Sequence, residues 1–232
     1  MLYMLFDLCF LIEHRYEMSE RMLKSCMINC EEKPVCHIKI TDTEIENEKK
    51  RNPDYSIEYC EVIAIQRKIA EILPGYSGFF IHSASVSIDK TGYLFLGLSR
   101  AGKSTHASGW VKYLKDKNAQ IINDDKAVIR IIDNKAYIYK NPLFSKVEEK
   151  NEKILLKAAY FINQSKVNSI KKTDIKKIIP KLINQTHIPD NAELKIKYFE
   201  TLDMFVNSIL FYDLWCDISS DAVYMAYNEV WK

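Results

Sequence analysis

The sequence predicts an α/β protein whose β-sheet is mixed. Runs rich in β-branched and aromatic residues alternate with segments of helical periodicity, and several of these runs are joined by turns too short to hold a crossover helix. Strands separated by helices favour parallel pairing, whereas strands joined by tight turns pair antiparallel. The 232 residues, 47% of them hydrophobic, suffice for one sizeable domain or for a domain with a small appendage.

The N-terminal third predicts two strands and a helix. Residues 1–14, “MLYMLFDLCFLIEH”, are expected to form a buried strand, because Asp7 interrupts the run and a signal peptide would need a basic start and a small-residue cleavage site. A second strand is predicted at 35–40, followed by acidic connecting material at 41–54. Apolar residues at near-helical spacing then predict a helix from residue 61 that ends at Pro74 and Gly75.

The middle of the chain predicts hairpins around a single helix. Residues 78–89 and 92–98 are expected to form a hairpin with a Lys-Thr-Gly turn, and residues 104–114 a helix. A strand is predicted at 119–123, and a second hairpin at 126–140 that turns at Asp133 and Asn134. Residues 154–162 predict a further core strand.

The remainder predicts a mostly helical region as far as “LWCDI”, residues 214–218, and then a closing helix. Residues 1–75 are expected to pack as an N-terminal strand and helix segment on a core domain formed by 76–232, the two together making one compact unit.

Charge and hydropathy exclude several classes of protein. The formal net charge is +2, and lysines outnumber carboxylates about two to one between Lys146 and Lys197, a pattern typical of a solvated face. No apolar run approaches the roughly 20 residues that span a bilayer. We therefore expect a cytoplasmic protein that has neither nucleic acid nor a membrane as its partner.

The six cysteines predict reduced thiols, since the chain shows no export signal. Cys26, Cys30 and Cys36 lie near one another in the sequence, and His37 follows directly. A zinc or iron-sulfur site is therefore the alternative, although the spacing does not match a pair of close CxxC knuckles.

The stretch “LFLGLSRAGKSTHASGW”, residues 94–110, contains the most specific motif. It matches G-x-x-x-x-G-K-[ST], and it follows a predicted strand and opens a predicted helix, which is the context that a phosphate-binding loop requires. Glycines let successive N–H groups point inward, and the helix N-terminus adds partial positive charge. The predicted nucleotide-binding residues are Gly97, Leu98, Ser99, Arg100, Ala101, Gly102, Lys103, Ser104 and Thr105. Lys103 would reach the phosphates, and the Ser104 hydroxyl would be a ligand to Mg²⁺.

An acidic pair follows the next predicted strand. Asp124 and Asp125 offer the hard oxygen ligands that Mg²⁺ prefers, and two adjacent carboxylates can divide metal binding from proton transfer. The alternative is an ordinary turn rich in Asp and Asn after a strand. The Ser104 hydroxyl and one of these two carboxylates are the predicted metal ligands.

The motifs “FFIHSASVSIDKTGYLFLGLSRAGKSTHASGW” and “IINDDKAVIRI” resemble the P-loop kinases related to the catalytic domain of HPr kinase/phosphorylase, whose core is shared with ATP-dependent phosphoenolpyruvate carboxykinases. Relatives of this kind occur in low-GC Gram-positive bacteria. The resemblance implies a mixed-sheet P-loop core with flanking helices, ATP with Mg²⁺, and phosphoryl transfer to an alcohol. It further implies that Asp124 is the general base, that Asp125 handles the metal and that His82 lies near the base. The expected catalytic residues are thus Asp124, His82 and Lys103. For His82 the alternative is a satisfied polar residue within a strand.

The sequence departs from the family pattern in the acceptor region. A Pro-Trp-x-Gly-Lys-like stretch is usual after the second hairpin, whereas this chain has “NPLFSK” at 141–146, with Leu143 for the aromatic residue and Ser145 for the glycine. No arginine follows Arg130, so an arginine that stabilises the transferred phosphoryl group would be Arg100 or Arg130, unless a lysine or a partner subunit of a homo-oligomer serves instead.

Two classes of function remain. The first is an ATP- and Mg²⁺-dependent kinase that acts on a hydroxyl, either a Ser or Thr of a peptide or small protein or a small-molecule alcohol. The second is a non-catalytic nucleotide-binding partner or regulator of a peptide-maturation system. The altered 141–146 segment favours the second class, and the intact Asp124–Asp125 pair favours the first.

Overall fold

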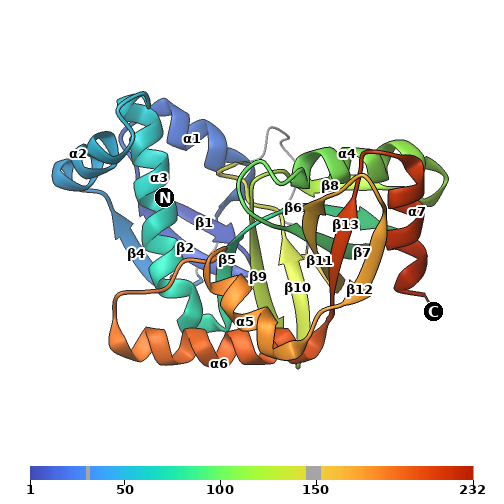
Figure 1. Ribbon diagram of the computed structural model, residues 1–232. Helices are drawn as coiled ribbons and strands as arrows, with labels where there is room; N and C mark the ends of the chain where they lie inside the picture. Colours follow the sequence, from blue (N-terminus) through green and yellow to red (C-terminus); the bar gives the residue numbers. More distant parts are fainter. Residues whose placement is uncertain (30–31, 145–152, 232) are drawn as a thin grey trace.

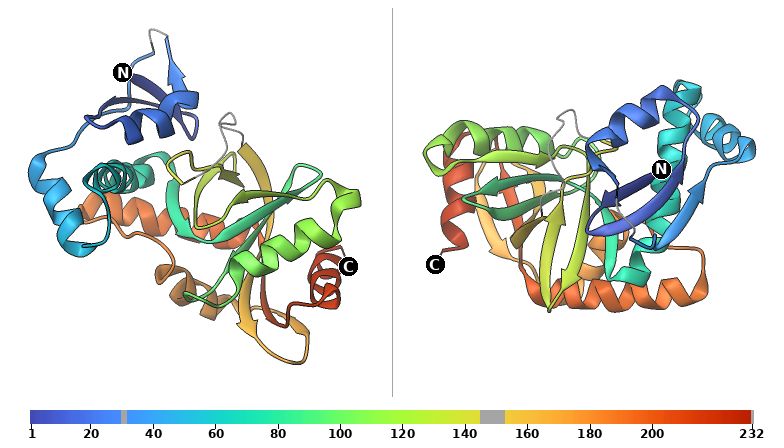
Figure 2. Two further views of the ribbon diagram at one scale, coloured as in Figure 1. Left: turned by 90° about the horizontal axis from the view of Figure 1, so that it is seen from above. Right: turned by 180° about the vertical axis from the view of Figure 1, so that it is seen from behind.

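The computed structural model describes residues 1–29, 32–144 and 153–231. It is a mixed α/β fold with two sheets (Figure 1). The smaller sheet belongs to the N-terminal part of the chain and the larger one to the rest, and the helix α3 (Ile57–Ile72) lies between them (Figure 2). None of the helices within the described residues is both long and apolar enough to cross a membrane.

The smaller sheet contains β1 (Leu2–Leu5), β2 (Leu8–Glu13), β3 (Met27–Ile28) and β4 (Cys36–Lys39), in the order β3-β1-β2-β4. The single strand expected at 1–14 was wrong, because the chain turns at Phe6 and Asp7, whose φ angles are 57° and 59°. Phe6 is fully buried and Asp7 accepts a hydrogen bond from the Tyr139 hydroxyl at 2.7 Å. These contacts with the larger sheet stabilise the turn. After β2 come the helix α1 (Glu17–Leu23) and the short 3-10 helix η1 (Lys24–Cys26), neither of which was predicted.

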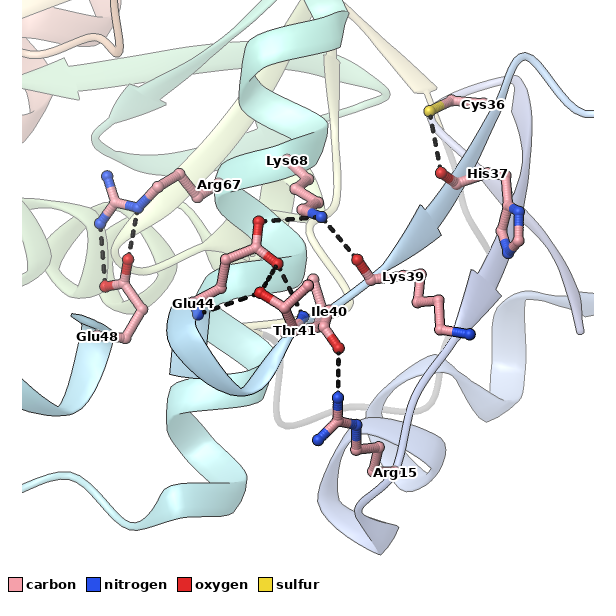
Figure 3. A network of polar contacts seen from close by, with 10 residues as sticks. All are labelled: Arg15, Cys36, His37, Lys39, Ile40, Thr41, Glu44, Glu48, Arg67 and Lys68. Atoms are coloured by element: carbon pink, nitrogen blue, oxygen red, sulfur yellow. Dashed lines mark hydrogen bonds and ion pairs between the residues drawn. The ribbon is translucent and has the colours of Figure 1, made fainter. Parts of the chain in front are cut away.

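The acidic stretch expected to be connecting material contains the helix α2 (Asp42–Arg51). Its first turn is closed by a capping box, in which the Thr41 side chain accepts from the Glu44 N–H while the Glu44 carboxylate accepts from the Thr41 N–H (Figure 3). The helix α3 (Ile57–Ile72) begins at the cap residue Ser56 and continues into the 3-10 helix η2 (Leu73–Tyr76), where Pro74 was expected to end it. The capping box outweighs the acidic composition that had suggested connecting material.

The larger sheet has nine strands among the described residues, in the order β5-β9-β10-β11-β7-β6-β8, with β13 paired to β11 and to β12. Their bounds are β5 (Gly78–His82), β6 (Ala84–Ile88), β7 (Thr91–Leu96), β8 (Gln120–Asn123), β9 (Lys126–Ile132), β10 (Lys135–Tyr139), β11 (Lys153–Gln164), β12 (Ser169–Lys172) and β13 (Leu210–Cys216). The strands β7, β11 and β13 are parallel, and the other pairs are antiparallel. The predicted mixed sheet is confirmed.

Helices cover both faces of this sheet (Figure 1). On one face lie α5 (Ile175–Ile183) and α6 (Ala192–Ser208); on the other lie α4 (Lys103–Tyr113), which leads into the 3-10 helix η3 (Lys115–Lys117), and α7 (Ser220–Glu229). In β7 the side chains of Leu94 and Leu96 pack toward α6, while Tyr93 and Phe95 pack toward α4. Burial on both faces explains why “YLFL” is uninterruptedly apolar.

Two further expectations were wrong in detail. The first hairpin of the larger sheet turns at Asp89 and Lys90, with φ angles of 44° and 63°, rather than at Lys-Thr-Gly. The region after residue 162, expected to be mostly helical, contains the strands β12 and β13 besides α5 and α6. The turn at Asp133 and Asn134 is confirmed, with φ angles of 50° and 58°.

Trp110 is the largest fully buried side chain among the described residues, and it lies on the α4 face of the larger sheet. Its ring is fully buried against Tyr93, Phe95 and Tyr160, and its indole N–H donates to His106 Nε2 at 3.0 Å.

We expect Trp110→Ala to lower the free energy of unfolding by about 3–5 kcal/mol in urea denaturation, because the cavity would lie between two packed layers. Ile218→Ala is the control, since that side chain is 81% exposed and its loss is expected to change stability by less than about 0.5 kcal/mol. Equal effects of the two substitutions would contradict the packing described here.

Candidate functional site

The loop 97–102 joins the carboxyl end of β7 to the start of α4. Gly97 has a φ of 147° and Gly102 a φ of 98°. A Cβ at Gly97 would lie 3.1 Å from the Ala101 Cβ and 3.2 Å from the Ile162 carbonyl oxygen, whereas a Cβ at Gly102 would meet nothing within 4 Å. A glycine is therefore needed at position 97 because neighbouring atoms approach closely. At position 102 it is needed because of the backbone conformation alone.

Lys103 is the first residue of α4, one residue before the predicted start. Its side chain is only 7% exposed and folds back over the loop, where Nζ donates to the carbonyl oxygens of Gly97 at 3.0 Å and Leu98 at 3.2 Å. Burial lowers the pKa of Lys103, and the nearby negative charge of Asp125 opposes that shift. Within the described chain no side chain caps the N-terminus of α4. The loop thus presents an ammonium group and the partial positive end of a helix at one place.

The predicted acidic pair forms the bend between β8 and β9. Pairing of His82 with Lys126 and of Ser85 with Asn123 places Asp125 opposite Ser83, and the Ser83 N–H donates to the Asp125 carbonyl at 2.9 Å. This register places the bend beside the end of β5. The bend also lies near the glycine loop, because β8 returns along the sheet after α4. The Ser104 hydroxyl donates to the Asp124 carbonyl at 3.4 Å.

His82 contacts Asp125. Its Nε2 lies 3.0 Å from Asp125 Oδ1, and this hydrogen bond is the main reason that the pKa of Asp125 lies below its ordinary value. The resemblance had implied that His82 lies near Asp124, but the side-chain contact is with the second aspartate. Asp124 contacts the start of α4 through its main-chain carbonyl, which accepts from the Ser104 hydroxyl. His82, Lys103, Ser104, Asp124 and Asp125 are nonetheless brought together at one end of the larger sheet.

Gln185 also joins the site, although the sequence assigned it no role. The two atoms that its side-chain amide faces are carbonyl oxygens, which assigns the amide nitrogen to that side. So oriented, it donates to the carbonyl of His82 at 3.2 Å and to that of Gly97 at 2.9 Å. The His82 N–H donates in turn to the Gln185 carbonyl at 2.7 Å. The segment after α5 thereby joins the histidine strand to the glycine loop. The sequence around Gln185 has no motif spacing that points to this role.

Two cavities adjoin the loop. One of about 520 Å³ lies along residues 97–101 and is further lined by Phe161, Ile162, Asn163, Gln164, Lys181, Asn184 and Gln185. The other, of about 510 Å³, begins at Gly102 and Thr105 and extends to the end of β13. Both open at the carboxyl ends of the parallel strands, the usual place for ligands in α/β sheets.

Of the two arginines that the sequence offered for phosphoryl stabilisation, only Arg100 lines the larger of these cavities. Arg130 instead donates to the carbonyls of Tyr76 at 3.1 Å and Phe6 at 2.7 Å, and so joins the two sheets. Lys181 lines the same cavity as Arg100 and is ion-paired with Asp213. It is a cation that the sequence did not single out.

The departure at 141–146 is partly accounted for. Leu143 is fully buried in the core, and the next residue, Phe144, supplies an aromatic ring that lies 4.7 Å from the Lys126 ammonium. Ser145 and Lys146 lie outside the described residues.

The cysteine cluster gathers no metal-binding group within the described part of the chain. Cys26 is buried and Cys36 half-buried, and burial raises the pKa of both thiols, while His37 pairs with Glu13 at 2.8 Å. Cys30 lies outside the described residues. None of the five described cysteines forms a disulfide.

Comparison with known proteins adds little. No protein-family model and no curated protein sequence matches the chain. Among solved structures, the HPr(Ser) kinase/phosphatase from Coxiella burnetii aligns with 65% of this chain and 95% of its own, at a TM-score of 0.35 and 10% sequence identity. A likeness of this degree does not place the chain in that family, so the proposals below depend on the chain's own residues.

The hydrogen bond from His82 yields a pH prediction. In His82→Phe we expect the pKa of Asp125 to rise, because burial then acts on the carboxylate without its main compensating donor. In the wild type this bond stabilises the fold above the ordinary aspartate pKa of 3.8, and the stabilisation is lost as pH falls through the lower folded value. Carboxyl-carbon NMR titration measures the shift. His37→Phe, which removes a histidine from the smaller sheet, is expected to leave Asp125 unchanged, and an equal response in both variants would overturn the assignment.

Proposed function

We propose that this protein is an ATP- and Mg²⁺-dependent kinase that transfers a phosphoryl group to a hydroxyl. One observation carries the proposal: the glycine loop, Lys103, Ser104 and the Asp124–Asp125 bend meet at one end of the sheet although the bend follows the loop by some twenty residues. A phosphate-binding loop and an adjacent carboxylate pair are the two parts that phosphoryl transfer needs most.

The loop fits a polyphosphate. Lys103 Nζ now donates to two loop carbonyls, and an anion in the loop would offer it stronger, charge-assisted acceptors. The first N–H groups of α4 have no side-chain cap among the described residues and are available to the same anion. The cavity of about 520 Å³ along residues 97–101 is within the usual range for a ligand site.

Ser104 and Asp125 fit a hard divalent cation. Asp125 uses Oδ1 toward His82, which leaves Oδ2 for a metal, and the Ser104 hydroxyl is exposed beside the same bend. When bound, Mg²⁺ would neutralise charge on the phosphates. His82 then acts as the residue that orients Asp125.

Asp124 is assigned the role of general base, which accepts the proton of the acceptor hydroxyl. In the proposed step the acceptor oxygen forms a bond to the γ-phosphorus, the bond from that phosphorus to the β–γ bridging oxygen breaks, and the hydroxyl proton passes to the Asp124 carboxylate. The products are ADP and a phosphate monoester. Asp124 suits this role because its side chain is exposed and its neighbour Asp125 is engaged by His82.

Removal of the loop lysine tests nucleotide binding. Lys103→Ala is expected to weaken ATP binding in calorimetry by about ten- to a hundred-fold, the typical worth of a hydrogen bond to a charged group. Ser104→Ala should weaken the dependence of ATP binding on Mg²⁺. Lys112→Ala, an exposed lysine on the same helix, is the control and should bind ATP as the wild type does. Unchanged affinity in Lys103→Ala, or wild-type ATP binding that persists in excess chelator, would contradict the site.

The two aspartates separate a kinase from a regulator. Asp124→Asn keeps the side-chain shape but cannot take a proton, so turnover should fall by about 10² to 10⁴ while affinity for ATP with Mg²⁺ is retained. Asp125→Asn removes a charge from the metal site and should weaken metal-nucleotide binding as well. Transfer of label from ATP and calorimetry measure the two effects. If Asp124→Asn keeps full turnover, or if the wild type binds ATP but transfers nothing to any acceptor, the nucleotide-binding regulator becomes the better interpretation.

A further inference from the structure

A third cavity, of about 270 Å³, lies beside His82 and is lined by no residue of the glycine loop. Its wall comes from α3, from β5, from the start of β9 and from the segment after α5. The lining residues are Ile63, Gln66, Arg67, Ala70, Phe80, Ile81, His82, Lys126, Asn184, Gln185, Thr186 and His187. Asn184 and Gln185 also line the cavity along the loop, so the two cavities adjoin one another across this segment.

A network of ion pairs holds Arg67 on the α3 side of the cavity. Glu48 is 2% exposed and binds Arg67 through two hydrogen bonds, from Nε at 2.6 Å and from Nη2 at 3.0 Å. Arg51 donates to the same carboxylate at 2.6 Å. In Figure 3 the third nitrogen of Arg67 points away from Glu48, and no hydrogen bond joins it to another described residue. Arg67 thus keeps a donor for a ligand while its charge is partly balanced.

Two further groups of the cavity lack an obvious partner. Gln66 is 7% exposed, and its Oε1 is buried without a hydrogen-bond donor among the described residues. Lys126 is half-buried with its ammonium over the Phe144 ring, and no carboxylate of the described chain lies within ion-pair distance of it. Lys126 therefore has charge to offer a ligand, whereas Gln66 Oε1 has almost no accessible surface and does not face the cavity.

We propose that this cavity is the acceptor site and that it takes a small alcohol bearing a carboxylate, such as a hydroxy amino acid or a dihydroxy acid. The inference rests on the proposed kinase function. Lys126 and the free donor of Arg67 would bind the carboxylate. The hydroxyl would then lie toward His82 and the aspartate bend.

Size and charge support a small molecule with a single carboxylate. A volume of about 270 Å³ is at the lower limit of ligand pockets, which suits a molecule of a few carbons better than a folded protein surface. A dianionic phosphate would be repelled by Glu48 and Asp125, which flank the two cations. The N-terminal part of the chain, through α3, would then select the acceptor, while the larger sheet binds the nucleotide.

Matched pairs of alcohols test the acceptor. L-serine and serinol differ by a carboxylate in place of a hydroxymethyl group, and so do D-glycerate and glycerol. We expect the wild type with ATP and Mg²⁺ to phosphorylate at least one of the two carboxylates, with a kcat/KM about ten-fold or more above that of its neutral or cationic counterpart. A short serine peptide with blocked ends is included and is expected to be a poor acceptor.

Variants locate the binding groups. Lys126→Gln should raise the KM for the carboxylate about ten-fold while the affinity for ATP with Mg²⁺ stays at the wild-type value. Lys68→Gln is the matched control, because Lys68 follows Arg67 on α3 but turns to Glu44 and the Lys39 carbonyl, outside the cavity (Figure 3). It should change neither constant.

Binding without turnover separates this inference from the kinase proposal. Saturation-transfer NMR with D-glycerate or L-serine alone should show binding to the wild type that is lost in Lys126→Gln and kept in Lys68→Gln. If ATP binds and a neutral alcohol or only the peptide is phosphorylated, the acceptor assignment is overturned and the kinase stands. If neither carboxylate binds at millimolar concentration, the cavity is not the proposed site. If a carboxylate binds as expected but ATP does not, the cavity assignment stands as a carboxylate site and the kinase fails.

Discussion

The candidate site depends on the antiparallel pairing of residues 78–88 with residues 120–132. One side of this antiparallel ribbon consists of β5 and β6, and the other side consists of β8 and β9. Its register places Ser83 opposite Asp125. His82 and the acidic bend therefore meet at one point. A shift of the register by one residue would turn His82 and Asp125 to different neighbours, because successive side chains point to opposite faces. The glycine loop lies at the same place because it follows the carboxyl end of the parallel strand β7.

A second constraint joins the parts that this ribbon does not reach. Gln185 is buried between the strand that contains His82 and the glycine loop, and it contacts a carbonyl of each. The segment after α5 therefore separates the cavity beside His82 from the cavity along residues 97–101. Arg130 plays a similar part between the two sheets, with the carbonyls of Phe6 and Tyr76 as its acceptors. Both residues act through main-chain oxygens, which positions backbone segments directly.

Local signals predicted the elements well where propensity and turn chemistry agree. The hairpin at Asp133–Asn134, the helix after Gly102 and the apolar runs of β7 and β11 were all recognisable from the sequence. The errors arose where hydrophobicity was the only guide. Residues 1–14 are apolar on both sides of a turn at Phe6 and Asp7, whose positive φ angles are stabilised by contacts made far along the chain. Residues 41–51 are too polar to suggest a core helix, although the capping box at Thr41 and Glu44 was present in the sequence.

By itself the sequence determined the mixed α/β class, the glycine loop at 97–104 and the presence of two aspartates after the next strand. These are local patterns of two to twelve residues, and local sterics and backbone hydrogen bonding account for them. Only the tertiary structure decided that His82 contacts the second aspartate, that Gln185 lies between histidine and loop, and that Gln66, Arg67 and Lys126 share a cavity beside them. Those contacts join residues up to about a hundred positions apart, and they exist because strand register and helix packing, which no local pattern encodes, bring distant segments to the same edge of the sheet.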